Sequence, residues 1–403
     1  PINFSLEERE RVIYHAWELL QNINFKYYFF LDNCAYRMAE LLETAWEDES
    51  RINTSGAFWA IPVDVLFKIQ KFPANKSKKN LLGSSLLLPS RQRKLQQKVT
   101  QLSEKEIIQL KFLIETVDHL DSEEFLGFSE KSQARIIDAK IDYLQYKKIG
   151  EISVLQEKSL NKLLLRRSYL PILDNDVLAE IPKAPTEGNP PMRFRFGSVH
   201  NTITGNAIEI GSWANYHDLL GNESGHIKNA EVITLDLNLQ INKNFFEITK
   251  FQLFNIQKYS LSPSAIPGDF EWSWRTRAVW ERENFSCFTC KNFRLVGGFG
   301  GSISLAGRDL EYALIDLFGE TSGDLRSVAT FGYAPHLGLT WSPFDIWKIK
   351  LEGGWHKSFY GPKKEYFRGI FKQRFSLDKD LDFRVEIEFH KNIELNSSLN
   401  FYW

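Results

Sequence analysis

One cysteine in this 403-residue sequence stands where a reactive thiol would be expected. Cys34 follows an Asp-Asn pair in the stretch DNCAYRMAELLETAW, residues 32–46. Apolar residues recur after it at helical spacing, and Asp32 or Asn33 is a preferred N-cap, so Cys34 falls in the first turn of a predicted helix. The N–H groups of a first turn and the positive end of the helix dipole favour a thiolate and offer donors to an oxyanion. The pattern indicates a thiol nucleophile, and a buried structural cysteine is the alternative.

A thiol nucleophile needs a base, and the eight histidines offer few candidates. One precedes the cysteine in a predicted helix, and another lies in the stretch NYHDLLG of the second half. The candidate catalytic residues are Cys34, Asn33 and His15. The candidate substrate-binding residues are Tyr36, Arg37 and His217. A structural role inside the fold is the alternative for both histidines.

The other two cysteines, Cys287 and Cys290, form a CxxC pair in the stretch FSCFTCKN. We predict a local disulfide in an oxidising compartment, which leaves Cys34 as a free thiol. A redox motif is the alternative. A zinc site would need two further ligands, and none stands at suitable spacing. The sequence therefore predicts neither a metal nor a cofactor.

The overall composition excludes some partners. The chain has 50 Lys and Arg against 51 Asp and Glu, a net charge of -1, so bulk electrostatics would not hold a nucleic acid. No apolar run approaches the roughly 18 residues that a membrane-spanning helix needs, and the sequence does not start with a secretion signal. A length of 403 residues is sufficient for two domains.

The spacing of apolar residues along the sequence divides the chain into two parts. Up to about residue 180 the helical period dominates, with predicted helices at 6–21, 61–71, 103–119, 130–148 and 153–167. In the first of these helices, one face gathers Val12, Ile13, Trp17, Leu19 and Leu20. Residues 181–191 contain four prolines and predict a stiff linker.

After the linker the period becomes two. The runs 231–242, 347–356 and 381–390 alternate apolar and polar residues, and the first places Ile233, Leu235, Leu237, Leu239 and Ile241 on one face. About twelve such runs follow residue 192, each close to the ~10 residues that cross a bilayer at a tilt. Charges crowd the polar faces, and the chain stops at LNFYW, a terminal aromatic that resembles the assembly signal of outer-membrane proteins. We predict a membrane barrel, with a soluble β-sandwich as the alternative.

A family resemblance adds to these observations. The stretches HAWELL, YYFFLDNCAYRMAELLE, FWAIPVDVL, LPSRQRKL, LLRRSYL, ANYHDLLG, SLSPSAIP and SWRTR occur in this order. Together they resemble the family that carries the Lnb (lipoprotein N-acyltransferase) N-terminal periplasmic domain, in its long form with a C-terminal β-barrel. The resemblance implies a circularly permuted papain or NlpC-type fold. It also implies thiol acyl transfer: Cys34 would accept a fatty acyl group from a phospholipid as a thioester and pass it to a lipoprotein amine or to water.

One departure from the family concerns the histidine. The family places its catalytic histidine in a Gly-His motif upstream of the Asn-Cys helix, and no such motif precedes Cys34 here. We therefore expect that an N-terminal piece lies ahead of residue 1. Arg37, Asp64, Arg166 and Arg167 stand at motif positions and are candidates for binding a lipid head group, with fold-stabilising roles as the alternative.

The combined prediction is an α+β protein of the outer membrane of a Gram-negative bacterium. A mainly helical papain-like domain, residues 1–180, would face the periplasm, followed by the linker 181–191 and a transmembrane barrel of about 12 strands, residues 192–403. The expected partners are membrane lipid, a lipoprotein acceptor and the outer-membrane assembly machinery. An amidase acting on peptidoglycan and a non-enzymatic barrel plug or scaffold are the alternative functions.

Overall fold

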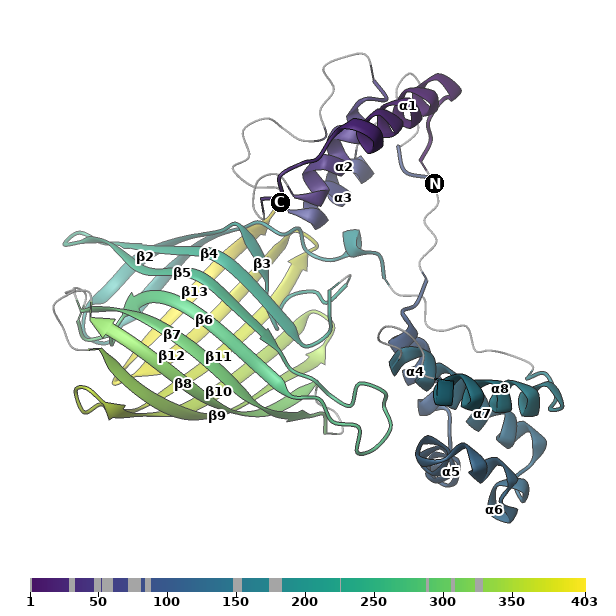
Figure 1. Cartoon of the computed structure of the whole chain (residues 1–403). Helices are drawn as coiled ribbons and strands as arrows, with labels where there is room; N and C mark the ends of the chain where they lie inside the picture. The colour runs from purple at the N-terminus through teal and green to yellow at the C-terminus, as the bar shows by residue number, and fades with distance from the viewer. Residues whose placement is uncertain are drawn as a thin grey trace. The chain divides into compact units, whose positions relative to one another are not determined.

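The computed structural model describes residues 2–28, 33–46, 52, 61–71, 81–83, 88–147, 154–173, 183–224, 226–287, 290–305, 309–322 and 329–403. Two compact units make up the chain (Figure 1). The first comprises Pro1–Leu86, Lys183–Tyr259 and Ser273–Trp403, and the second comprises Leu87–Pro182 with Ser260–Trp272. Helices precede an antiparallel barrel, which confirms the predicted α+β class.

Three helices form the N-terminal region: α1 (Leu6–Asn22), α2 (Cys34–Glu43) and α3 (Pro62–Lys71). Ser5 caps α1 in a capping box with Glu8, which satisfies the first unpaired N–H groups. Their shared core contains Ala35, Ala39, Leu42, Val65 and Ile69. Only part of the apolar face predicted for α1 packs against this core, because Ile13, Trp17 and Leu20 are 57%, 64% and 82% exposed.

The helical unit after residue 87 contains α4 (Arg91–Thr100), α5 (Glu104–Glu115), η1 (Val117–Asp121), α6 (Glu123–Leu126), α7 (Glu130–Lys147) and α8 (Val154–Ser168). The predicted helices at 103–119, 130–148 and 153–167 are confirmed. Helix α4 was not predicted, because its residues are mostly polar and only Leu95 and Val99 are buried. No helix among the described residues is long and apolar enough to cross a membrane.

A segment from far along the chain completes this helical unit. Ile266, from the stretch 260–272, is 4% exposed and belongs to the same hydrophobic core as Leu110 and Phe125. The side-chain amides of Gln92 and Gln96 each donate to the Pro263 carbonyl at 3.1 Å. The segment between β5 and β6 is thus an integral part of the helical unit.

The barrel follows the predicted Pro-rich stretch. Residues 181 and 182 of that stretch lie outside the described part, and the chain then forms η2 (Pro185–Glu187). The strands are β1 (Arg193–Asn201), β2 (Gly205–Trp213), β3 (Asn215–His217), β4 (Ala230–Ile241), β5 (Phe246–Lys258), β6 (Ser273–Arg282), β7 (Lys291–Ile303), β8 (Leu310–Ser322), β9 (Thr330–Phe344), β10 (Trp347–Tyr360), β11 (Glu365–Asp378), β12 (Leu381–His390) and β13 (Asn392–Tyr402). Neighbouring strands are antiparallel throughout.

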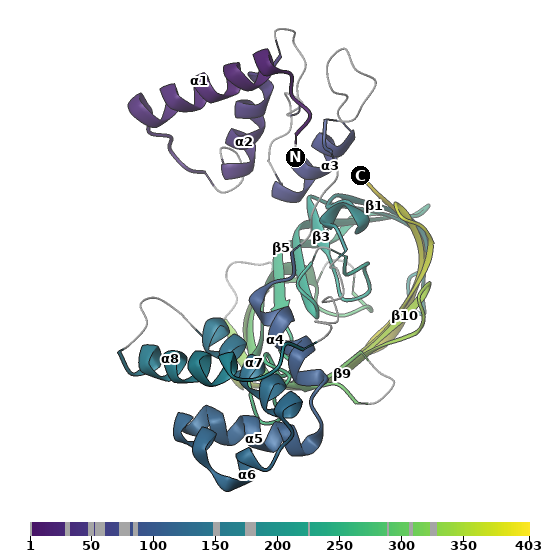
Figure 2. The same cartoon turned by 90° about the vertical axis from the view of Figure 1, so that its right-hand side faces the viewer.

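The sheet closes on itself (Figure 2). β1 pairs with β13, and β2 pairs with β4 at Ile208↔Ile241. β3 continues on β4 in the same register, at Asn215↔Thr234, so β2 and β3 are two parts of one barrel strand. The thirteen segments within the described residues therefore make a closed barrel of twelve strands, which confirms the predicted number.

The predicted alternation separates lumen from outer wall. On β12, Asp382, Arg384 and Glu386 are buried in the lumen, and Ile387 and Phe389 face outward, as the pattern predicts. The prediction for β4 is wrong at Ile233, which is buried with Trp213 and Tyr402. Leu235 has a φ of 52°, which distorts the strand locally. After Ile233, the next residue that faces the lumen is therefore Asp236 and not Leu235.

Candidate functional site

The sequence-predicted thiol lies at the first residue of α2. Cys34 is exposed and is not part of a disulfide. Asn33 is buried, and its Oδ1 accepts hydrogen bonds from the N–H groups of Ala35 and Tyr36, both at 3.1 Å. The N-cap is therefore Asn33, and Asp32 lies outside the described residues. Because Asn33 engages these two N–H groups, they are not the oxyanion donors that the sequence suggested.

The first turn after Cys34 carries the Arg37 guanidinium, which lies against aromatic rings. The Arg37 guanidinium lies 4.4 Å from the Phe25 ring centroid and 5.4 Å from that of Tyr36. Its Nη1 also donates to Glu40 Oε2 at 2.7 Å. Tyr36 and Arg37 follow the thiol within one turn of helix, so the structure groups these two predicted binding residues with Cys34.

The two candidate histidines have other partners than the thiol. His15 Nδ1 lies 3.5 Å from Glu18 Oε2 on α1. His217, at the end of β3, is buried and stacks on His226 with centroids 3.7 Å apart and planes 9° from parallel. Burial lowers the pKa of His226, which keeps this second ring neutral. The partners that the structure gives these candidates are thus Glu18 and His226.

The remaining head-group candidates are engaged within the fold. Asp64 pairs with Lys68 at 2.7 Å along α3. In the helical unit, Arg167 Nε donates to Asp138 at 2.8 Å, and Arg166 donates to Gln133 at 3.0 Å. These contacts favour the fold-stabilising alternative for the three residues.

A buried ionic cluster lies at the barrel end where both β1 begins and β13 ends. Arg384 is 1% exposed and donates through Nη1 to Asp218 at 2.5 Å, through Nε to Asp382 at 3.1 Å and through Nη2 to the Tyr402 hydroxyl at 2.8 Å. Asp382 also accepts from Arg374 at 2.7 Å. The cluster ties the segment after β3 to the lumen side of β12.

Further ion pairs connect strands that are not neighbours in the wall. Arg282 on β6 reaches Glu394 on β13 at 2.6 Å, and Glu281 on β6 reaches Arg368 on β11 at 3.0 Å. They surround a lumen cavity of about 240 Å³ that ten basic and ten acidic residues line. Because the charges balance, the lumen carries no strong field of either sign.

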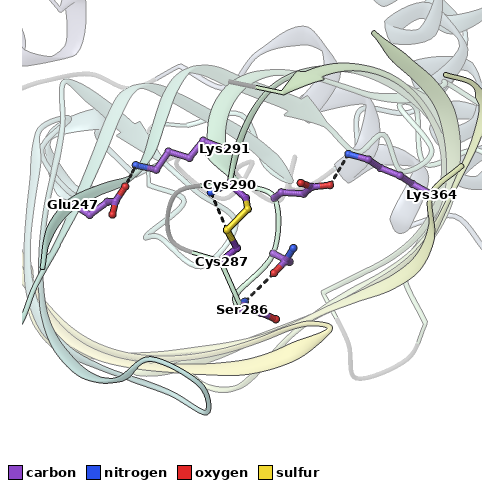
Figure 3. The surroundings of a disulfide bond; sticks show 8 residues. Glu247, Ser286, Cys287, Cys290, Lys291 and Lys364 are labelled. Atoms are coloured by element: carbon purple, nitrogen blue, oxygen red, sulfur yellow. Dashed lines mark hydrogen bonds and ion pairs between the residues drawn. A yellow bond between two sulfur atoms is a disulfide. The ribbon is translucent and has the colours of Figure 1, made fainter. Parts of the chain in front are cut away.

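The other end of the barrel is crossed by the loop that contains the CxxC pair. Cys287 and Cys290 form a disulfide between β6 and β7 (Figure 3). The Phe285 carbonyl accepts from Asn201 Nδ2 at 3.0 Å, and Glu283 pairs with Lys364 at 2.6 Å. These partners belong to β1 and to the β10–β11 connection, so the loop lies over the mouth of the barrel.

The residues that organise the lumen could not be paired from the sequence. Charged strand faces predict a wet lumen, but partners such as Asp218 and Arg384 are far apart in the chain. The stretches ANYHDLLG and SWRTR were a usable signal, since the first supplies His217 and Asp218 and the second supplies Arg275. Arg275 binds Asp316 and also reaches Glu352 at 2.7 Å.

Together these features define the class of protein. Large apolar side chains such as Phe299, Leu337 and Trp341 are exposed on the outer wall of a closed barrel whose polar side chains are buried in the lumen. Only a bilayer makes such a wall favourable, so this is an outer-membrane β-barrel protein with a helical N-terminal region. The chain belongs to the family described as "Domain of unknown function (DUF7840)", whose model matches residues 182–403, more than half of its length.

A second family model, described as "Lnb N-terminal periplasmic domain", matches residues 1–68. This match confirms the predicted kinship of the N-terminal region and supports the outer-membrane location. Acyl transfer and the papain-like fold stay predictions. The comparison with curated proteins finds no match.

Solved barrels provide further similarities. The chain is similar to a KdgM porin at 9% identity and a TM-score of 0.32, over 52% of this chain and 99% of that chain. It is similar to the NanC porin at 9% identity and a TM-score of 0.33, over 53% and 99% of the two chains. It is also similar to outer-membrane expressed OmpT of Vibrio cholerae at 7% identity and a TM-score of 0.28, over 58% and 100%.

Proposed function

We propose that this protein is a thiol-dependent acyltransferase or acyl hydrolase that acts on membrane lipid, with Cys34 as the nucleophile. The observation that carries the proposal is the exposed thiol at the first residue of α2, behind a buried Asn33 that fixes the start of the helix. The thiolate is the reactive form of such a nucleophile.

The surface near this thiol supports a lipid donor. Helix α1 exposes large apolar side chains along one side, and exposed aromatic residues follow it toward α2: Leu6, Ile13, Tyr14, Trp17, Leu20, Phe25, Tyr27 and Tyr28. An amphipathic helix with aromatic neighbours is typical of binding at the boundary between head groups and acyl chains. Such binding would bring the N-terminal helices, and Cys34 with them, to a lipid surface.

The proposed reaction has two steps. The Cys34 thiolate attacks the carbonyl carbon of the lipid ester, the carbon–oxygen bond breaks, and the alcohol leaves with a proton from the general acid. The acyl group is then held as a thioester until an amine, such as that of a lipoprotein, or water attacks the same carbon and restores the thiolate. His15, on the neighbouring helix, is the candidate general base among the described residues.

The test is an intact-mass measurement. Full-length protein in detergent is incubated with vesicles of phosphatidylethanolamine, and the expected result is a fatty-acyl adduct that hydroxylamine removes. Cys34→Ser should abolish the adduct, and Cys287→Ser/Cys290→Ser should keep it, because the thiol alone carries the chemistry. His15→Ala should slow adduct formation by about 10²-fold if His15 is the base.

Two results would contradict the proposal. An adduct that forms equally on Cys34→Ser would exclude this nucleophile. Cleavage of peptidoglycan fragments with no acyl adduct would instead favour the amidase. The lipoprotein acceptor is tested separately, by adding a diacylated lipopeptide and following the gain of a third acyl chain.

A further inference from the structure

A group of polar residues lies on the outer wall of the barrel, at positions where the alternating pattern predicts apolar side chains. On β1 the outward positions run from Phe194 and Phe196 to Ser198 and His200. On the neighbouring strand β13, the outward-facing Ser397 stands between the outward-facing Leu395 and Leu399. Polar side chains on a lipid-facing wall are unfavourable, and such residues are therefore candidates for function.

The register brings these residues together with an asparagine. Ser198 and His200 lie two positions apart on the same face of β1, about 7 Å apart at their Cα atoms. His200 is directly opposite Asn206 of β2, and Ser198 is opposite Ser397 of β13. His200 Nδ1 lies 2.6 Å from Asn206 Oδ1.

This hydrogen bond sets the chemistry of the imidazole. An amide oxygen only accepts, so Nδ1 of His200 carries the proton and donates it. In its neutral form the ring then has a lone pair on Nε2, which is the arrangement of a general base oriented by a third residue. A serine, a histidine and an orienting amide are the three groups that a serine acyl hydrolase needs.

The three residues open onto a shared hollow. A depression of about 740 Å³ is lined by Ser198, His200, Asn206, Ile208, Lys243 and Ser397 among others. Ile208 is 48% exposed and offers an apolar surface to an acyl chain. Lys243 brings a positive charge to the rim, which suits the phosphate of a lipid head group.

The hollow lies toward one end of the barrel. β1 begins at Arg193, which pairs with Tyr402 near the end of the chain, and ends at Asn201. Ser198 lies three residues from that far end, about 10 Å along the tilted strand. The site therefore lies toward the barrel end opposite the start of β1 and the end of β13.

We propose that Ser198, His200 and Asn206 form a second acyl hydrolase site, which cleaves a fatty-acyl ester of a membrane lipid on the outer wall of the barrel. Ser198 Oγ bonds to the ester carbonyl carbon while its proton passes to His200 Nε2. The carbon–oxygen bond to the alcohol breaks, and that alcohol leaves with the proton. Water then hydrolyses the acyl-serine, which releases the fatty acid and restores Ser198. Asn206 is a positioning residue.

The test uses the full chain in the Cys34→Ser background, so that its outcome is independent of the thiol. A fluorophosphonate probe should label the protein at Ser198, and vesicles of phosphatidylethanolamine should yield free fatty acid. Ser198→Ala should abolish labelling and reduce release by at least about 10³-fold, and His200→Gln should do the same. A parallel set of vesicles with lipid A distinguishes the two sources of the ester.

The positioning role of Asn206 is tested by a matched pair of variants. Asn206→Ala should reduce release by about 10²-fold or more, and Asn206→Asp should restore it because a carboxylate also accepts from Nδ1. Ser212→Ala, at an exposed outward position of β2 outside the hollow, is the control and should keep wild-type labelling, and Ser397→Ala tests the hydroxyl on the neighbouring strand. Heat-dependent mobility in gel electrophoresis checks that each barrel is folded.

Three outcomes would overturn the inference. The first is no labelling and no fatty acid release from either lipid by folded protein. The second is release that survives Ser198→Ala. The third is loss of labelling in Ser397→Ala with Ser198→Ala unaffected, which would place the nucleophile on the wrong strand.

Discussion

Replacing Arg384 by methionine should destabilise the barrel because it leaves a buried carboxylate without its cation. Arg384 binds Asp218, Asp382 and Tyr402 and is 1% exposed. Asp382 keeps Arg374 and the Tyr402 hydroxyl, both at 2.7 Å, so it remains compensated. Asp218 loses its bidentate partner. Removing one member of a buried pair costs about 3–5 kcal/mol, and with one acid still compensated we expect about 3 kcal/mol.

The assay is urea unfolding of the protein in lipid vesicles, followed by tryptophan fluorescence and by heat-dependent gel mobility. The double variant Arg384→Met/Asp218→Asn should recover much of the loss, because it removes the acid together with its bidentate partner. Lys357→Met is the control: Lys357 forms an exposed pair with Glu365 at 3.8 Å, and its loss should change the free energy of unfolding by less than about 0.5 kcal/mol. The reasoning is refuted if Arg384→Met matches Lys357→Met, or if the double variant is no more stable than Arg384→Met.

Three further predictions concern single features. Burial lowers the pKa of Lys140 from its ordinary value of 10.5 to about 8. Between these two pH values the folded state therefore binds fewer protons than the unfolded state. The free energy of unfolding of the helical unit should rise from pH 8 to 10.5 by up to about 3 kcal/mol. Hydrogen exchange in α7 should show this rise and Lys140→Met should lack it; an equal rise in both would contradict it. Asn33→Ala should lower the protection of α2 amides by about 1 kcal/mol and Asn33→Asp should not, because only the alanine removes the cap; equal protection in both variants would exclude a capping role. Cys287→Ser/Cys290→Ser should lower the hydrogen-exchange protection of the loop around Phe285 by up to about 2 kcal/mol. The urea midpoint for unfolding of the barrel should stay unchanged. A shifted midpoint would show that the loop supports the barrel wall.

The sequence predicted the barrel well because alternation is a local property. The runs at 347–356 and 381–390 separate lumen from lipid at each residue, and no distant partner is needed to see it. The error at Ile233 has a local cause that alternation does not encode, namely the left-handed backbone of Leu235. Closure of the sheet between β2 and β4 depends on long-range pairing and was predicted only through the number of strands.

The candidate sites were less accessible from sequence. The start of the helix at Asn33–Cys34 was predicted because it depends only on adjacent residues. The hydrogen bonds from the Ala35 and Tyr36 N–H groups to Asn33 depend on side-chain geometry and were not predicted. Ser198 and His200 could not be separated from ordinary strand residues, because their meaning depends on Asn206 across the hairpin and on which face meets lipid. Partners such as Arg282 and Glu394 meet only when the barrel has closed.

The contribution of residues 260–272 to the helical unit has a consequence for the order of folding. Helices α4 to α8 precede Ile266 in the chain, so their core is incomplete until the β5–β6 connection joins it. Their last contact closes a long loop, which is entropically slow and requires the β5–β6 connection to be available. Packing of the helical unit thereby depends on a segment that lies between two barrel strands, and a chain cut after β5 should leave these helices loosely packed and open to proteases.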